Sequence, residues 1–276
     1  MTISALSILC MTLSALISIG VPVGLWIYYH KRYGAKIVPA LTGAAAFLIF
    51  AMGLEQVMHM LVLKPQPDGS TWLTGYPVAF MLYGAFAAGI FEETGRFFSF
   101  KLLKRRYGGI RTALSYGVGH GGIEAILLGG ASMIASIVMS ILVNAGQAAT
   151  LTAGENGALV SAQLSALAAT PPALFLVAGI ERMLALTIHI SLSVLVYYSV
   201  YHKGSFWLYP AAILLHAAVD MLPALAKTGV VTNVLVIEGV VFLMSVALAL
   251  LAVYTHRRLK PEAEEGATSH PEREAQ

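Results

Sequence analysis

The stretch RTALSYGVGHGGIEAILLGGASMIASIVMSILV, residues 111–143, decides the fold. About 20 mostly apolar residues are enough for a helix to cross a bilayer, and this run is longer than that. Hydrophobic residues make up 58% of the whole chain and charged residues 11%, whereas a soluble domain is usually about a quarter charged. The sequence therefore predicts an all-α, polytopic membrane helix bundle.

Membrane spans are expected in seven places along the chain. They lie at roughly 3–29, 36–63, 76–100, 111–143, 172–201, 206–226 and 231–255. The first is interpreted as a helix and not as a removable signal, because no basic stretch precedes it and no small-residue cleavage site follows. We expect one transmembrane domain over 1–255 and a disordered cytoplasmic tail over 256–276, which is charged and lacks an apolar pattern.

The basic residues orient the predicted helices. With seven spans and the N-terminus outside, thirteen Lys and Arg residues fall on the inner side and only Lys64 and Lys227 on the outer side. Because inner segments of membrane proteins are rich in Lys and Arg, the C-terminus is predicted to be cytoplasmic. The lipid bilayer is the expected environment, with no soluble domain and no nucleic-acid partner.

Ionisable residues are unusually frequent within the predicted spans. They are Glu55, His59, Glu92, Glu93, Arg96, His120, Glu124, Glu181, Arg182, His189, His216, Asp220 and Glu238. Each costs several kcal/mol at the bilayer centre unless it is paired or hydrated. The pattern therefore predicts a polar site buried between helices.

Depth sorts these residues into two layers. At 1.5 Å per residue, two glutamates and three histidines lie about 12–18 Å from the cytoplasmic face, on four different helices. This inner layer holds Glu92, Glu93, His120, His189 and His216, with Glu124 and Asp220 one turn deeper. The outer layer is expected to pair structurally, with Arg182 against Glu55 or the neighbours of Glu181, and the site to open toward the cytoplasmic half.

Spacing predicts contacts inside the inner layer. Arg96 follows Glu92 by four residues and Glu93 by three, so it can reach either carboxylate. Two histidines have a carboxylate four residues later, which can fix the tautomer of the imidazole. These pairs are His120 with Glu124 and His216 with Asp220. Glycines surround the first pair and serve either helix packing or the close approach of a substrate.

This set of side chains fits two kinds of chemistry. Adjacent carboxylates in an apolar pocket cannot both ionise cheaply, which suits a general base and acid acting on water. Glu and His chains are equally at home in a proton- or cation-coupled transporter. A zinc site of His120, His189 and His216 with a glutamate is a further option, although the chain has no HExxH or HxxEH motif.

Four motifs together resemble a known family. They are FEETGR (91–96), GHGGIE (119–124), the histidine of LTIHI (186–190) and HAAVD (216–220). In this order they are similar to the YhfC family of predicted bacterial intramembrane proteases, within the superfamily of CAAX prenyl endopeptidases and PrsW. The resemblance covers a core of about residues 76–225. It implies a multi-pass protein of the bacterial inner membrane that acts on membrane-embedded or lipidated peptides.

The resemblance also implies roles for individual residues. Glu92 would activate water with Glu93 as its partner, and His189 would help to hold that water. His216 and Asp220 would stabilise the oxyanion. Arg96, His120 and Glu124 would support the site. The prenyl endopeptidases space their first motif as Glu-Glu-x-x-x-Arg, whereas two residues separate Glu93 from Arg96 here.

The expected activity is therefore an intramembrane endopeptidase of glutamic type that needs no cofactor. A zinc-dependent version of the same protease and a proton- or cation-coupled transporter are the alternatives. A transporter would be expected to show internal repeats, and the sequence shows none.

Overall fold

The computed structural model describes residues 1–64, 66, 70–73, 75–154 and 156–259, and every regular element among them is helical. The elements in chain order are α1 (Ala5–Tyr33), α2 (Ile37–Ala46), η1 (Phe47–Glu55), α3 (Gln56–Leu63), α4 (Pro77–Leu103), α5 (Ile110–Glu124), η2 (Ala125–Ala131), α6 (Ser132–Asn144), α7 (Ala148–Leu151), α8 (Gly157–Ala169), α9 (Pro172–Tyr201), α10 (Leu208–Ala226) and α11 (Val234–Leu259). Here η denotes a π-helical segment. α2, η1 and α3 follow one another without a break, and so do α5, η2 and α6.

The described part of the chain holds six helices that are long and apolar enough to cross a membrane. They are Ala5–Tyr33, Ile37–Leu63, Ile110–Asn144, Pro172–Tyr201, Leu208–Ala226 and Val234–Leu259. α4 is equally long, but its two glutamates and its arginine make it less apolar. With α4 the bundle has the seven long helices that the sequence predicts, so the all-α membrane fold is confirmed. The orientation of the two termini stays a prediction.

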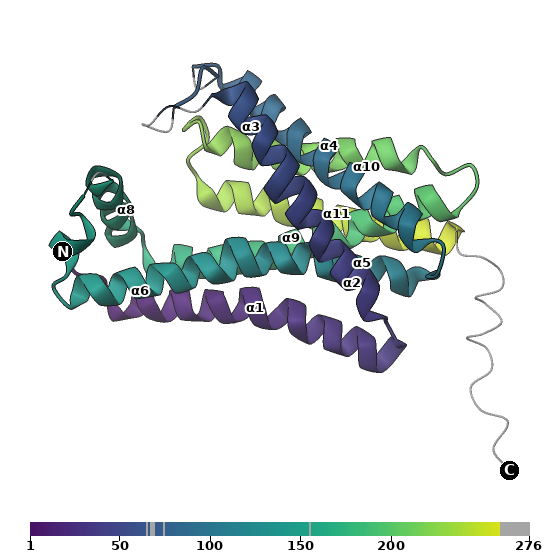
Figure 1. Ribbon diagram of the computed structural model, residues 1–276, viewed down its shortest axis with the longest axis horizontal. Coiled ribbons are helices and arrows are strands. Elements are labelled where there is room, and N and C mark those ends of the chain that lie inside the picture. Colours follow the sequence, from purple (N-terminus) through teal and green to yellow (C-terminus); the bar gives the residue numbers. More distant parts are fainter. Residues whose placement is uncertain (65, 67–69, 74, 155, 260–276) are drawn as a thin grey trace, which may run out of the picture.

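α9 lies at the centre of the bundle. It packs against α1, α4, α5, α10 and α11, and it is the most buried of the apolar helices. α4 and α10 form the most extensive helix pair, and Figure 1 shows them side by side. The larger hydrophobic core lies between α4, α5, α9, α10 and α11. A smaller one joins the start of α1 to α6, α8 and α9.

Small residues allow α1 to lie close to its neighbours. A Cβ on Gly179 of α9 would lie 2.8 Å from Ser14 Oγ, and one on Gly129 of η2 would lie 2.6 Å from Ser18 Oγ. Close approach of this kind is the usual means by which helices pack tightly in a membrane. It sets α1 directly against η2 and the first half of α9.

Three features depart from the sequence prediction. The segments η1 and η2 widen two of the spans into π-helix, a rare form that is frequent at functional sites. Residues 144–171, which lie between two of the predicted spans, contain α7 and α8, and α8 lies near the N-terminus at the end of α6 (Figure 1). α8 is too short to span, and its buried Leu164 anchors it on the smaller core. α11 continues to Leu259, and the rest of the predicted tail, 260–276, lies outside the described residues.

Candidate active site

The polar residues of the predicted inner layer lie together where α4, α5, α9 and α10 meet. α4 contributes Glu92, Glu93 and Arg96; α5 contributes His120 and Glu124; α9 contributes His189; α10 contributes His216 and Asp220. Ion pairs or hydrogen bonds link all eight side chains into one network. The two glutamates that adjoin in sequence have different surroundings within it.

Glu93 is fully buried and held by two cationic or hydrogen-bonding partners. Arg96 Nη1 lies 2.5 Å from Glu93 Oε1 and 2.6 Å from Oε2. His216 Nδ1 lies 2.7 Å from the same Oε1. Arg96 is fully buried as well. Breaking such a pair would leave an uncompensated charge in an apolar core, so Glu93 is suited to holding the helices together.

Glu92 instead reaches the cavity described below. Its Oε2 lies 2.8 Å from His120 Nε2 and 3.8 Å from His189 Nδ1. His120 is completely buried, and its Nδ1 has no hydrogen-bond partner among the described residues. Glu92 is therefore the glutamate of the pair that can meet a substrate, and His120 is the imidazole in direct contact with it.

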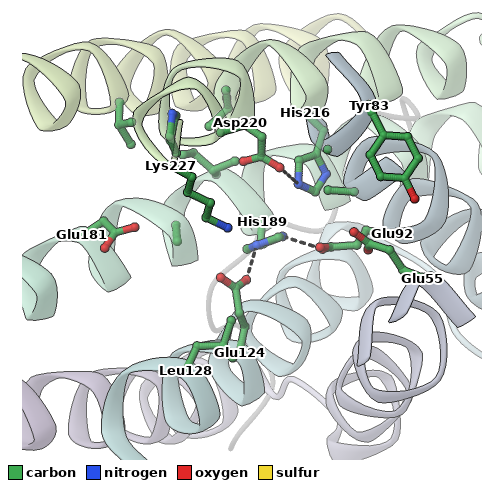
Figure 2. A pocket seen from close by; sticks show the side chains of 18 of the residues that line it. Glu55, Tyr83, Glu92, Glu124, Leu128, Glu181, His189, His216, Asp220 and Lys227 are labelled. Carbon is green, nitrogen blue, oxygen red and sulfur yellow. Dashed lines mark ion pairs between the residues drawn. The ribbon is translucent and has the colours of Figure 1, made fainter. Parts of the chain in front are cut away.

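The hydrogen bonds of His189 fix its tautomer. Arg96 Nη2 lies 3.1 Å from His189 Nδ1. A guanidinium can only donate, so Nδ1 accepts and the ring proton of the neutral imidazole is on Nε2. His189 Nε2 is in close contact with Glu124 Oε2, and because a carboxylate can only accept, this contact agrees with a proton on Nε2. Figure 2 shows His189 between Glu124 and Glu92.

Glu124 has partners that its position in the helix did not predict. The expected pair with His120 on the same helix face is wrong, because His120 turns to Glu92 on α4. Glu124 Oε1 lies 2.8 Å from Arg182 Nη1 on α9. Arg182 also contacts Glu181. Arg182 was predicted to lie in a separate outer layer, whereas the structure connects it to the inner network.

The predicted pair of His216 and Asp220 is present but loose. His216 Nε2 lies 3.5 Å from Asp220 Oδ2, whereas His216 Nδ1 makes the shorter contact with Glu93. The side chain of Asp220 is 36% exposed. His216 therefore connects the buried Glu93 to the more open side of the site.

A cavity of about 500 Å³ adjoins this network (Figure 2). From the inner layer it is lined by Glu92, Glu124, His189, His216 and Asp220. Four residues of the predicted outer layer line it too, namely Glu55, His59, Glu181 and Arg182. The two layers therefore share one space. The proposed pairing of Arg182 with Glu55 is wrong, because Glu55 Oε1 lies 3.1 Å from His59 Nε2.

The cavity extends in the direction opposite to the one predicted. Its lining continues to Leu63 at the end of α3 and to Lys227 just after α10. These helix ends are on the side predicted to be external. On the other side the network is closed by aromatic packing. The ring centroids of Phe100 and Tyr116 lie 4.7 Å apart, and both residues are fully buried. In the predicted orientation the cavity therefore extends toward the external side and not, as expected, toward the cytoplasmic half.

Close packing explains the glycines around His120. A Cβ on Gly119 would lie 1.9 Å from the carbonyl oxygen of Ala40 on α2. A Cβ on Gly121 would lie 3.0 Å from His189 Cβ, and one on Gly122 would lie 3.0 Å from Pro22. α5 thus meets α2, α9 and α1 through its glycines, which favours helix packing over substrate contact.

Three residues of the network meet the requirements of a metal site. Glu92, His120 and His189 each offer one ligand atom, and these atoms lie within 4.8 Å of one another. All three residues are buried. Two imidazoles and a carboxylate are a common set of zinc ligands that leaves a coordination position open. His216, the third histidine considered from the sequence, is not part of this group.

Comparison with known proteins identifies the family. A family model described as YhfC intramembrane metalloprotease matches residues 17–241. The chain belongs to this family. It is also 34% identical over 256 residues to the uncharacterized membrane protein YhfC of Bacillus subtilis (strain 168), covering 91% of this chain and 96% of that protein. No solved structure matches the chain.

Family membership confirms the resemblance seen in the motifs and extends it beyond the core of residues 76–225. It supports an intramembrane protease and does not favour the transporter alternative. The relative and the six apolar helices together confirm a multi-pass bacterial membrane protein. The roles of the individual site residues stay proposals.

Proposed function

We propose that this protein is an intramembrane endopeptidase in which Glu92 activates water to hydrolyse peptide bonds of membrane-embedded or lipidated substrates. The observation that carries the proposal is that the two adjacent glutamates have different surroundings. Glu93 is fully buried between Arg96 and His216. Glu92 lines the cavity. A general base must come within hydrogen-bond reach of the proton that it removes, and the position of Glu92 on the cavity wall supports this role.

The surrounding side chains supply the other parts of a hydrolytic reaction. A water beside Glu92 and His189 attacks the peptide carbonyl carbon while Glu92 accepts a water proton. His120 keeps the carboxylate in position through its 2.8 Å contact. His216 lies beside Asp220 on the cavity wall, and in its protonated form it donates to Glu93 through Nδ1 and to the oxyanion through Nε2 as the carbonyl double bond opens. The proton then passes from Glu92 to the leaving nitrogen as the C–N bond breaks.

A zinc-dependent version of this protease is the second candidate, favoured by the group of Glu92, His120 and His189. These three residues would hold the ion. When bound, zinc would supply Lewis-acid polarisation of the peptide carbonyl. Arg96 opposes this version, because its guanidinium occupies the lone pair of His189 Nδ1 in the present arrangement. Glu92 would thus be the general base in the metal-free version and a metal ligand in the zinc-dependent version.

Cleavage and metal content, measured on the same preparation, test the proposal and separate its two versions. The purified protein is reconstituted in liposomes with a fluorescent transmembrane peptide, with and without chelator, and zinc is measured by elemental analysis. The proposed function predicts that the parent cleaves the peptide. Stoichiometric zinc that is lost together with activity, in chelator and in a His120→Ala variant, would establish the zinc-dependent version. A parent that cleaves none of a panel of transmembrane and lipidated peptides would refute the proposal.

A further inference from the structure

Arg182 lies on the cavity wall at the edge of the proposed site. Its side chain is 15% exposed. One guanidinium nitrogen, Nη1, lies 2.8 Å from Glu124 Oε1, and the other, Nη2, is in close contact with Glu181. Glu181 is more open, with 34% of its side chain exposed, against 12% for Glu124. The stronger effect of Arg182 is therefore expected at the more buried carboxylate.

Glu124 connects Arg182 to His189. Its Oε1 is held by Arg182, and its Oε2 is in close contact with His189 Nε2. On the opposite side of the ring, His189 Nδ1 accepts from Arg96 and faces Glu92 Oε2 at 3.8 Å. A carboxylate that accepts from one nitrogen of a histidine fixes the tautomer and the orientation of the ring. The direction of His189 Nδ1 toward Glu92 thus depends on where Glu124 is held.

The backbone beside Arg182 leaves room for its side chain. Gly129 lies in η2, the π-helical segment that begins directly after Glu124. A Cβ at Gly129 would lie 2.7 Å from Arg182 Cγ, so the missing side chain makes room for the arginine stem. The same Cβ would lie 2.6 Å from Ser18 Oγ. Arg182 therefore packs across η2, in position to reach back to Glu124.

We propose that Arg182 is a positioning residue of the hydrolytic site, which acts through Glu124 to hold His189 against Glu92. This proposal rests on the function proposed above. It assigns a role to an arginine that the four motifs leave out, and it gives a role to Glu124, which does not touch Glu92. The order of contacts is Arg182, Glu124, His189 and Glu92.

Kinetics of matched variants test the role of Arg182. Arg182→Gln is expected to lower kcat for a transmembrane peptide about 10- to 100-fold, as is usual for residues that orient a reactive group, with little change in KM. Arg182→Lys keeps a cation near Glu124 and is expected to recover part of the loss. Glu181→Gln, which removes the other carboxylate on Arg182, is the matched comparison and is expected to lower kcat much less than Arg182→Gln does. In a Glu124→Gln background, Arg182→Gln is expected to add little.

A second measurement reads the position of His189 without using activity. The ¹⁵N chemical shifts of the His189 ring, assigned with a His189→Gln variant, are expected to show the Nε2–H tautomer in the parent. They should move in Arg182→Gln and stay unchanged in Glu181→Gln. Unchanged shifts in Arg182→Gln would overturn the proposal, as would an unchanged kcat where the parent cleaves. An inactive parent would refute the proposed function alone, because the shifts still decide the role of Arg182.

Discussion

Replacement of Gly119 by alanine tests the closest helix contact around the site. The new Cβ would lie 1.9 Å from the carbonyl oxygen of Ala40 and 2.5 Å from its carbonyl carbon. Both are backbone atoms and cannot rotate away, so α2 and α5 must separate. Overpacking a tightly packed core costs about 1–3 kcal/mol and occasionally more, and this backbone clash places Gly119→Ala at the upper end of that range.

The measurement is equilibrium unfolding of the purified protein in mixed detergent micelles, followed by circular dichroism. Gly20→Ala is the matched control, because Gly20 lies in α1 and a Cβ added there would have nothing within 4 Å. Alanine is favoured over glycine in a helix by about 0.5–1 kcal/mol, so the control should equal or slightly exceed the parent. A Gly119→Ala variant as stable as Gly20→Ala would refute the direct packing of α2 on α5.

Two further predictions concern buried polar contacts. Arg96→Met leaves the Glu93 carboxylate buried without its cation and is expected to lower the free energy of unfolding by about 3–5 kcal/mol. Adding Glu93→Met should recover much of this loss in the same detergent assay. A double variant no more stable than Arg96→Met would contradict this account of the pair. The side chain of Asn144 forms hydrogen bonds with the backbone N–H and C=O of Ile3, at 2.8 and 2.9 Å. Asn144→Leu is therefore expected to lower the free energy of unfolding by about 1–3 kcal/mol and to speed hydrogen exchange at the start of α1. Unchanged exchange there would show that the contact does not anchor the N-terminus.

Much of the fold follows from composition alone. Long apolar stretches leave few alternatives to spanning helices, and the seven expected segments agree with the long helices of the structure. The π-helical segments were not predictable, because residues 47–55 and 125–131 are as apolar as the α-helix on either side. α8 was not predicted because its 13 residues are too short to span a membrane and no charge pattern marks it.

The residues of the network were visible in the sequence, but their partners were not. His120 and Glu124 are four apart and share a helix face, yet each pairs with a residue of another helix, Glu92 and His189 respectively. Which helix faces another depends on the rotation and tilt of both, and spacing within one helix carries no such information. Arg182 was misplaced for a related reason, since its long side chain reaches from the outer layer back to Glu124.

The direction in which the cavity extends could not be predicted from the sequence either. Counting residues inward from the helix ends gives the depth of each side chain but not the packing on either side of it. The structure places the fully buried rings of Phe100 and Tyr116 on the side predicted to be cytoplasmic. The space on the other side, lined by Leu63 and Lys227, follows from how α3 and α10 are placed.

The most direct test of the central claim is the cleavage rate of a Glu92→Gln variant on a transmembrane peptide in liposomes. The amide keeps the shape of the side chain but cannot accept a proton from water. Because general base catalysis contributes about 10²–10⁴-fold, the rate is expected to fall by at least about 100-fold. Glu55→Gln, at a buried carboxylate that lines the same cavity, should retain most of the rate of the parent. Cleavage by Glu92→Gln at the parental rate would contradict the account.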